Sequence, residues 1–93
     1  NASLAIAYVN TSRKVATKID FGLVAAGRLV AEARDVGTFS PGVEIEHVFG
    51  LDPSVFPLRV GLPHCIALRV FYRDGSVWRN RRLPARGPGM RVR

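Results

Sequence analysis

The side chains that could do acid–base or metal chemistry are few, and their spacing does not favour it. Glu44 and Glu46 stand two residues apart in a strand-like segment and share a face, as a hydrolytic carboxylate pair would require. A solvated polar face explains the same spacing more simply. His64 directly precedes Cys65, and neighbours on a strand point to opposite faces, so they cannot readily form a catalytic pair or ligate one metal.

The other candidate residues also have structural explanations. His47 stands on an apolar strand face, where a histidine is more often part of the core or a sheet edge than a ligand. No C-x-x-C or H-x₃-H spacing supplies the three or four ligands of a zinc site. Cys65 is the one cysteine, and a small buried hydrophobe explains it better than a reactive thiol. Asp35 and Asp74 are typical turn formers. We expect no catalytic residue, no cofactor and no metal.

The excess positive charge lies at the C-terminal end. Through Trp78 the sequence holds eight basic and seven acidic side chains, whereas residues 79–93 hold six arginines and no acid. The arginines are candidate contacts for an anion or a partner, and they are Arg79, Arg81, Arg82, Arg86, Arg91 and Arg93. The tail has no aromatic side chain for base stacking, so nucleic acid is the less favoured partner. We divide the chain into a domain over residues 3–78 and an Arg/Pro/Gly-rich tail over residues 79–93.

A period of two dominates the sequence and predicts the strands that must position these groups. Residues 15–23, 43–49 and 66–72 alternate between apolar and polar positions. Residues 4–9 are apolar on both faces and predict a more buried strand. Residues 28–34 contain good helix formers, but their place between two strong strands favours an edge strand over two helical turns.

Turn residues separate these segments. Asn10-Thr11-Ser12 follows the first strand, and although it matches an N-glycosylation acceptor, a turn explains it. Prolines at 53, 57 and 63 predict an irregular crossing loop over residues 50–64, with one helical turn near Pro53 as an option. Five or six short strands in one 93-residue domain predict an all-β, antiparallel two-sheet sandwich, with a small β-barrel as the alternative.

The last hairpin predicts where the sheet ends. Asp74-Gly75 is typical of a two-residue type I′ turn, which needs positive φ at both central residues. That loop would place Phe71 opposite Trp78. Continued pairing would then bring Arg79 and Arg81 onto the apolar face, which is costly if the face is core. We therefore expect the ladder to stop near Arg79 and the tail to leave the sheet there.

Three stretches together resemble small exported bacterial proteins of unknown function: residues 8–12, 35–42 and 72–78. The resemblance spans residues 5–78 and implies an immunoglobulin-like β-sandwich with no catalytic residues. It also implies that Cys65 has a disulfide partner near the N-terminus, for which this sequence holds no second cysteine. The sequence starts without Met, as it would after removal of a signal peptide or after excision of a domain.

These observations favour a non-enzymatic binding or structural module, periplasmic or secreted, with the cytoplasm as the alternative. The apolar runs fall far short of the ~20 residues that span a membrane. The expected partner is another protein or a second copy that forms a homodimer, recruited at an exposed strand edge, with residues 35–42 and 50–64 as further surfaces. The alternative is a nucleic-acid-binding module that acts through the basic tail.

Overall fold

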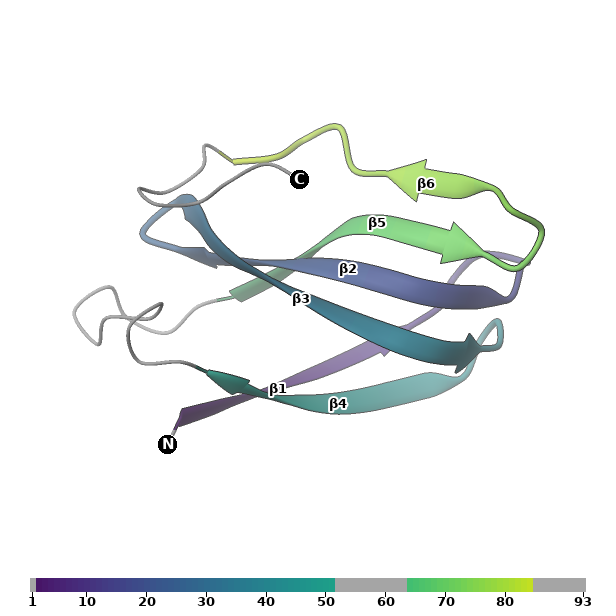
Figure 1. Ribbon diagram of the computed structural model, residues 1–93, viewed down its shortest axis with the longest axis horizontal. Coiled ribbons are helices and arrows are strands. Elements are labelled where there is room, and N and C mark those ends of the chain that lie inside the picture. The colour runs from purple at the N-terminus through teal and green to yellow at the C-terminus, as the bar shows by residue number, and fades with distance from the viewer. Residues whose placement is uncertain (1, 52–63, 85–93) are drawn as a thin grey trace.

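The computed structural model describes residues 2–51 and 64–84, which form six strands in two antiparallel sheets. β1 (Ala2–Val9) pairs with β4 (Glu44–Leu51) in a two-stranded sheet. The larger sheet has the order β3-β2-β5-β6 and consists of β2 (Ala16–Ala25), β3 (Arg28–Phe39), β5 (His64–Tyr72) and β6 (Val77–Arg79). The two sheets pack face to face (Figure 1), so the predicted antiparallel two-sheet fold is confirmed.

Two predicted features fall outside the described residues. The crossing loop and the helical turn near Pro53 lie mostly in residues 52–63, although Gly50 and His64 belong to β4 and β5. Arg86, Arg91 and Arg93 lie in residues 85–93. Among the residues that the structure does describe, no helix is long and apolar enough to cross a membrane.

β2 is a central strand, and its inward face forms the middle of the core. Ile19, Phe21 and Leu23 are buried between the sheets, as the alternation predicts. Ile6 of β1 and Phe39 of β3 belong to the same buried cluster. The core therefore joins both sheets through side chains that alternate along each strand.

The outward face of β2 is also buried, which the sequence did not predict. Asp20 is only 2% exposed because it lies directly opposite Arg34 on β3 and Arg69 on β5. Arg34 Nε donates to one carboxylate oxygen at 2.5 Å, and Arg69 Nε donates to the other at 2.8 Å. The Arg34 hydrogen bond, followed by that from Arg69, holds the pKa of Asp20 below its usual range against the opposing effect of burial. Arg69 also reaches Glu32.

β3 settles one prediction and overturns another. Residues 28–34 are an edge strand, as predicted. The prediction that Asp35 forms a turn is wrong, because β3 continues without interruption to Phe39. Asp35 is buried and bonded to side chains of the small sheet, so the strand position satisfies its carboxylate. The chain turns only after β3 has ended, where Gly42 has a φ of 81°.

The type I′ turn lies in a different hairpin from the predicted one. Ala26 and Gly27 between β2 and β3 have φ values of 52° and 73°, the positive pair that this turn requires. In the β5–β6 hairpin, only Gly75 among the loop residues has positive φ. Tyr72 accepts from the Gly75 N–H and donates to Ser76, which leaves a three-residue loop with a glycine bulge.

The extra loop residue shifts the predicted hairpin register by one. Phe71 lies opposite Val77, and Val70 lies opposite Trp78. Arg79 is therefore on the outward face, and not on the core face as the two-residue loop would require. The β6 strand does end at Arg79, as expected, with one further backbone bond from Asn80 to Leu68.

Candidate functional site

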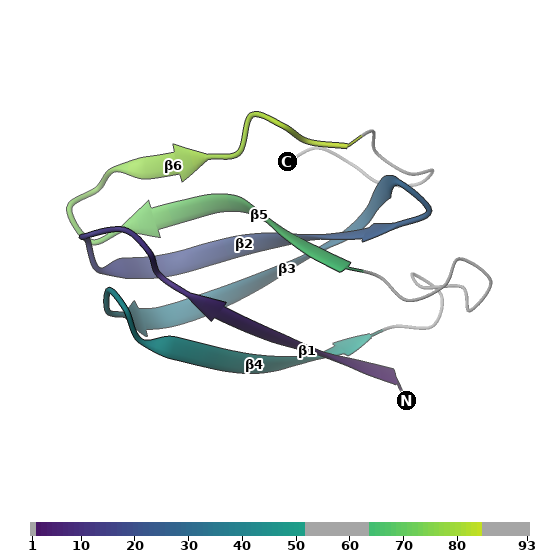
Figure 2. The same ribbon diagram turned by 180° about the vertical axis from the view of Figure 1, so that it is seen from behind.

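The small sheet covers only part of the large one. Tyr8 of β1 packs against Phe21 and Phe39, and Phe49 of β4 packs against Phe21, so β1 and β4 lie over β2 and β3. In Figure 2, the C-terminal half of β1 lies between β4 and the strands β5 and β6, whereas the N-terminal end of β1 passes below β4. Among the described strands, β1 is paired along one edge only.

A groove of about 350 Å³ lies between the C-terminal end of β1, with the loop that follows it, and the inner face of β2, β5 and β6, and we call it the β1–β6 groove. Its size falls within the ~300–1,000 Å³ typical of ligand pockets. Its lining is mostly apolar and aromatic, with polar side chains at one end, and consists of Tyr8, Val9, Asn10, Thr11, Ser12, Ile19, Phe21, Ala67, Val70, Tyr72 and Trp78. The groove thus lies against core-facing positions of the larger sheet, of which Trp78 is the most exposed.

Trp78 is the main unburied aromatic side chain of this groove. It lies opposite Val70, which packs against the core, yet 45% of its surface remains exposed. In a closed sandwich an inward aromatic of this size would be core. The sequence assigns Trp78 to the last hairpin but does not identify it as a site residue. The feature that could have identified it is a large aromatic side chain on an edge strand at the end of the domain.

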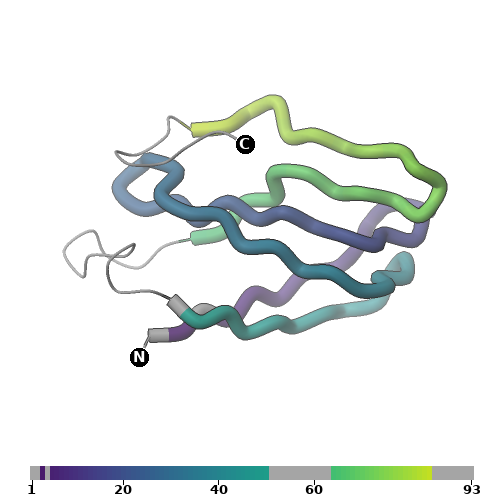
Figure 3. The backbone as a smooth tube through the Cα atoms, viewed as in Figure 1, coloured from purple at the N-terminus to yellow at the C-terminus, as the bar shows by residue number. Residues whose placement is uncertain are grey.

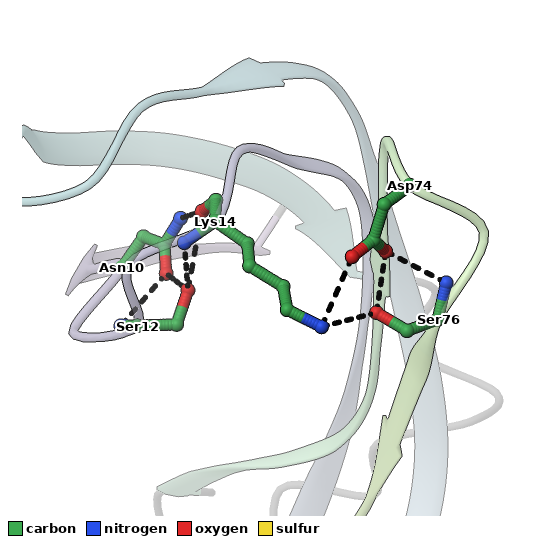
Figure 4. A network of polar contacts seen from close by, with 5 residues as sticks. All are labelled: Asn10, Ser12, Lys14, Asp74 and Ser76. Carbon is green, nitrogen blue, oxygen red and sulfur yellow. Dashed lines mark hydrogen bonds and ion pairs between the residues drawn. The ribbon is translucent and has the colours of Figure 1, made fainter.

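The β1–β2 connection and the β5–β6 hairpin are bonded to each other at one end of the sandwich, beside the groove. Figure 3 shows that the β1–β2 connection and the β5–β6 hairpin lie at the same end of the sandwich. Lys14 Nζ lies 3.0 Å from an Asp74 carboxylate oxygen and donates to Ser76 Oγ at 2.9 Å (Figure 4). Hydrogen bonds from the Ser76 hydroxyl and N–H, together with Lys14, lower the pKa of Asp74 to about 2.

Asn10 holds the first of these loops in place. Its side-chain amide is buried and donates to the carbonyls of Lys14 at 2.7 Å and Phe39 at 2.9 Å. Its carbonyl oxygen accepts from the N–H and hydroxyl of Ser12. Asn10-Thr11-Ser12 therefore acts as the predicted turn, and the amide nitrogen that glycosylation would modify is already in use.

A polar cluster of Tyr8, Asp35 and His47 connects the two sheets on the side of β3 and β4. The Tyr8 hydroxyl donates to one Asp35 oxygen at 2.5 Å, and His47 Nδ1 lies 3.0 Å from the other. Burial, with the hydrogen bond to Asp35, raises the pKa of the Tyr8 phenol. His47 stacks on Phe49, so it is a sheet-edge histidine. The cluster joins β3 of one sheet to β1 and β4 of the other.

The remaining candidate residues are spread apart. Glu44 and Glu46 are both exposed on β4, and His64 is exposed on β5. Cys65 is a partly buried free thiol packed against the core, and burial raises its pKa, which disfavours the reactive thiolate. Within residues 2–51 and 64–84, no group of three or more His, Cys, Asp or Glu side chains is placed to hold a metal ion.

The described arginines of the tail lie next to the groove. Arg79, Arg81 and Arg82 are exposed and line a shallow hollow along β6, and Trp78 lines both this hollow and the groove. Asn80 fixes this segment, because its side chain donates to the Ala67 carbonyl at 2.9 Å.

A comparison of the chain with protein-family models, curated proteins and solved structures finds no match to any of them. The resemblance to exported bacterial proteins, and the export that it implies, therefore stay predictions.

Proposed function

We propose that this chain is a protein-binding module that accepts an extended segment of a partner in the β1–β6 groove. The observation that carries the proposal is the incomplete small sheet: β1 has an unpaired edge among the described strands, directly beside an apolar groove with Trp78 exposed in it. An added strand would pair with the backbone of β1 and place alternate side chains against β5 and β6.

The groove can supply both the backbone hydrogen bonds and the side-chain contacts of such an interaction. The alternate N–H and C=O groups on the outer edge of β1 can form a new ladder, which supplies affinity with little dependence on sequence. The accessible apolar surface comes mainly from Val70, Tyr72 and Trp78, and it favours apolar side chains at alternate positions. Binding, and not catalysis, is what a groove of this composition supports best.

Selection from a displayed library of random peptides of about twelve residues tests the proposal. We expect enriched peptides to bind the parent protein and to lose at least about tenfold in affinity for Trp78→Ala, because the aromatic anchor is lost. Val36→Ala is the matched control, since Val36 is an exposed apolar side chain on β3, away from the groove. Failure to enrich any peptide, or equal binding to Trp78→Ala, would contradict the proposal.

A second candidate, binding of single-stranded nucleic acid, is favoured by one observation. The tail arginines Arg79, Arg81 and Arg82 border an exposed aromatic, Trp78, which could stack on a base. The test is binding of an oligonucleotide of about ten nucleotides at low and high salt. Strong, salt-dependent binding that is lost in R81E/R82E would support this function, and no binding at low salt would remove it.

A further inference from the structure

We infer that the segment accepted by the β1–β6 groove is a single strand with acidic residues at the end that lies near β6, and not the β1 strand of a second copy. This inference rests on the proposed function and narrows it to one class of partner. Two properties of the described residues carry it: the extent of the larger sheet beyond β1, and the distribution of charge around the groove.

Pairing between the β1 strands of two copies meets a steric obstacle. Identical antiparallel strands in one sheet are related by a twofold axis perpendicular to that sheet, so the larger sheets of both copies would lie on the same side of it. Each larger sheet extends past the C-terminal half of β1 by β5 and β6, toward the other copy. Since neighbouring strands are only ~4.8 Å apart, the two extensions would occupy the same space.

A lone extended segment avoids this collision. It brings no second layer, so it can lie over β5 and β6 and beside the edge of β1 with which no described strand pairs. The part of the larger sheet beside the groove includes the neighbouring strands β5 and β6. A terminal or linker segment of another protein, which has no sheet packed behind it, is therefore the form of partner that fits.

Charge around the groove favours acidic residues in that segment. On the β6 side, Arg81 and Arg82 are exposed and adjoin Trp78 in the shallow hollow, which has no acidic side chain in its lining. At the β5–β6 hairpin, the Asp74 carboxylate already bonds to Lys14 and Ser76. An acidic side chain that follows the apolar part of the segment would meet the positive charge of Arg81 and Arg82, and a basic one would be repelled.

The same charge disfavours the chain's own C-terminal residues as the occupant. Residues 85–93 contain Arg86, Arg91 and Arg93 and no acid. Their approach to Arg81 and Arg82 would bring like charges together. We therefore expect the groove to be available to a partner.

Intrinsic fluorescence gives a direct readout, because Trp78 is the one tryptophan of the sequence. The probes are an enriched peptide from the library, a version with lysine at each acidic position, and a scrambled version without alternation. We expect the enriched peptide to shift Trp78 emission to shorter wavelength as water leaves the ring. The lysine version should bind at least about tenfold more weakly at low salt, with a smaller difference at high salt. The scrambled version should not bind.

Two charge variants locate the effect. R81E/R82E should reverse the preference between the acidic and lysine peptides, whereas Arg28→Glu, which changes an exposed arginine at the start of β3, on the other edge of the larger sheet from β6, should not. Peptides that need Trp78 but show no acidic preference would overturn this inference and leave the proposed function standing. Absence of Trp78-dependent peptides would overturn both. A concentration-dependent dimer whose formation Trp78→Ala abolishes, or tighter binding of an oligonucleotide than of the peptide, would also overturn the inference.

Discussion

The two long flanks of the sandwich differ in how the larger sheet is covered. On the β3–β4 flank, aromatic packing and the Tyr8–Asp35–His47 cluster join the sheets. On the β1–β6 flank, the inner face continues past β1 and exposes Trp78 in a groove. We therefore expect a division of roles, in which the closed flank stabilises the fold and the open flank binds the partner that we propose. Variants on the closed flank should change stability, and variants on the open flank should change binding.

Truncation of a core side chain on the closed flank should have the largest effect. Phe39 is buried and packs edge-on against Tyr8, so Phe39→Ala should lower the free energy of unfolding by about 3–5 kcal/mol through lost burial and a cavity. Chemical denaturation followed by circular dichroism measures this loss. A change below about 1 kcal/mol would show that this flank does not stabilise the sandwich.

Tyr8→Phe separates the two roles within one side chain. The substitution keeps the ring that packs on Phe21 but removes the hydroxyl that donates to the buried Asp35. We expect the free energy of unfolding to fall by about 1.5–3 kcal/mol, the range for a hydrogen bond to a charged group. Peptide affinity at a temperature where the variant is folded should stay within about twofold of the parent. Loss of affinity with unchanged stability would reverse the assigned roles.

The sequence predicted the strands well because burial imposes a period of two. Ile19, Phe21 and Leu23, at odd positions of β2, are core, and the edge strand at residues 28–34 follows from its neighbours. The buried Asp20 could not be predicted in the same way. Its burial depends on Arg34 and Arg69 lying opposite it on two different strands, and bulges in both pairings help to set that register.

The groove depends on strand distribution, which alternation does not encode. Nothing in the local pattern says that, among the described strands, two oppose four, and this mismatch leaves Trp78 exposed. Turn chemistry was misassigned for a related reason. Asp74-Gly75 is compatible with two hairpin loops, and hydrogen bonds at Tyr72 select the three-residue form.

Asp74→Asn tests the loop contact at the end of the groove through its pH dependence. The folded pKa of Asp74, about 2, lies below its ordinary 3.8, so its charged form stabilises the fold above about pH 4 and this contribution is lost as pH falls toward 2. The variant should therefore show a shallower fall in melting temperature between about pH 5 and pH 2. Asp20 titrates in both proteins, so the informative quantity is the difference between them. Parallel curves would contradict a stabilising role for the Lys14–Asp74 contact.

Trp78→Ala should have the smallest effect on the fold. Because the ring is half-exposed and lies at a sheet edge, the free energy of unfolding should change by less than about 1 kcal/mol. Thermal unfolding followed by circular dichroism measures this change. A loss comparable to that of Phe39→Ala would mean that Trp78 is part of the core and that the open flank is not separate from the fold.

Amide hydrogen exchange of β1, with and without an enriched peptide, tests the central claim most directly. If the peptide adds a strand to the free edge, N–H groups at alternate positions of β1 should exchange more slowly in the complex, while those of the β3 edge stay unchanged. Binding that leaves β1 exchange unaltered, or that protects the edge of β3 instead, would contradict strand addition in the β1–β6 groove.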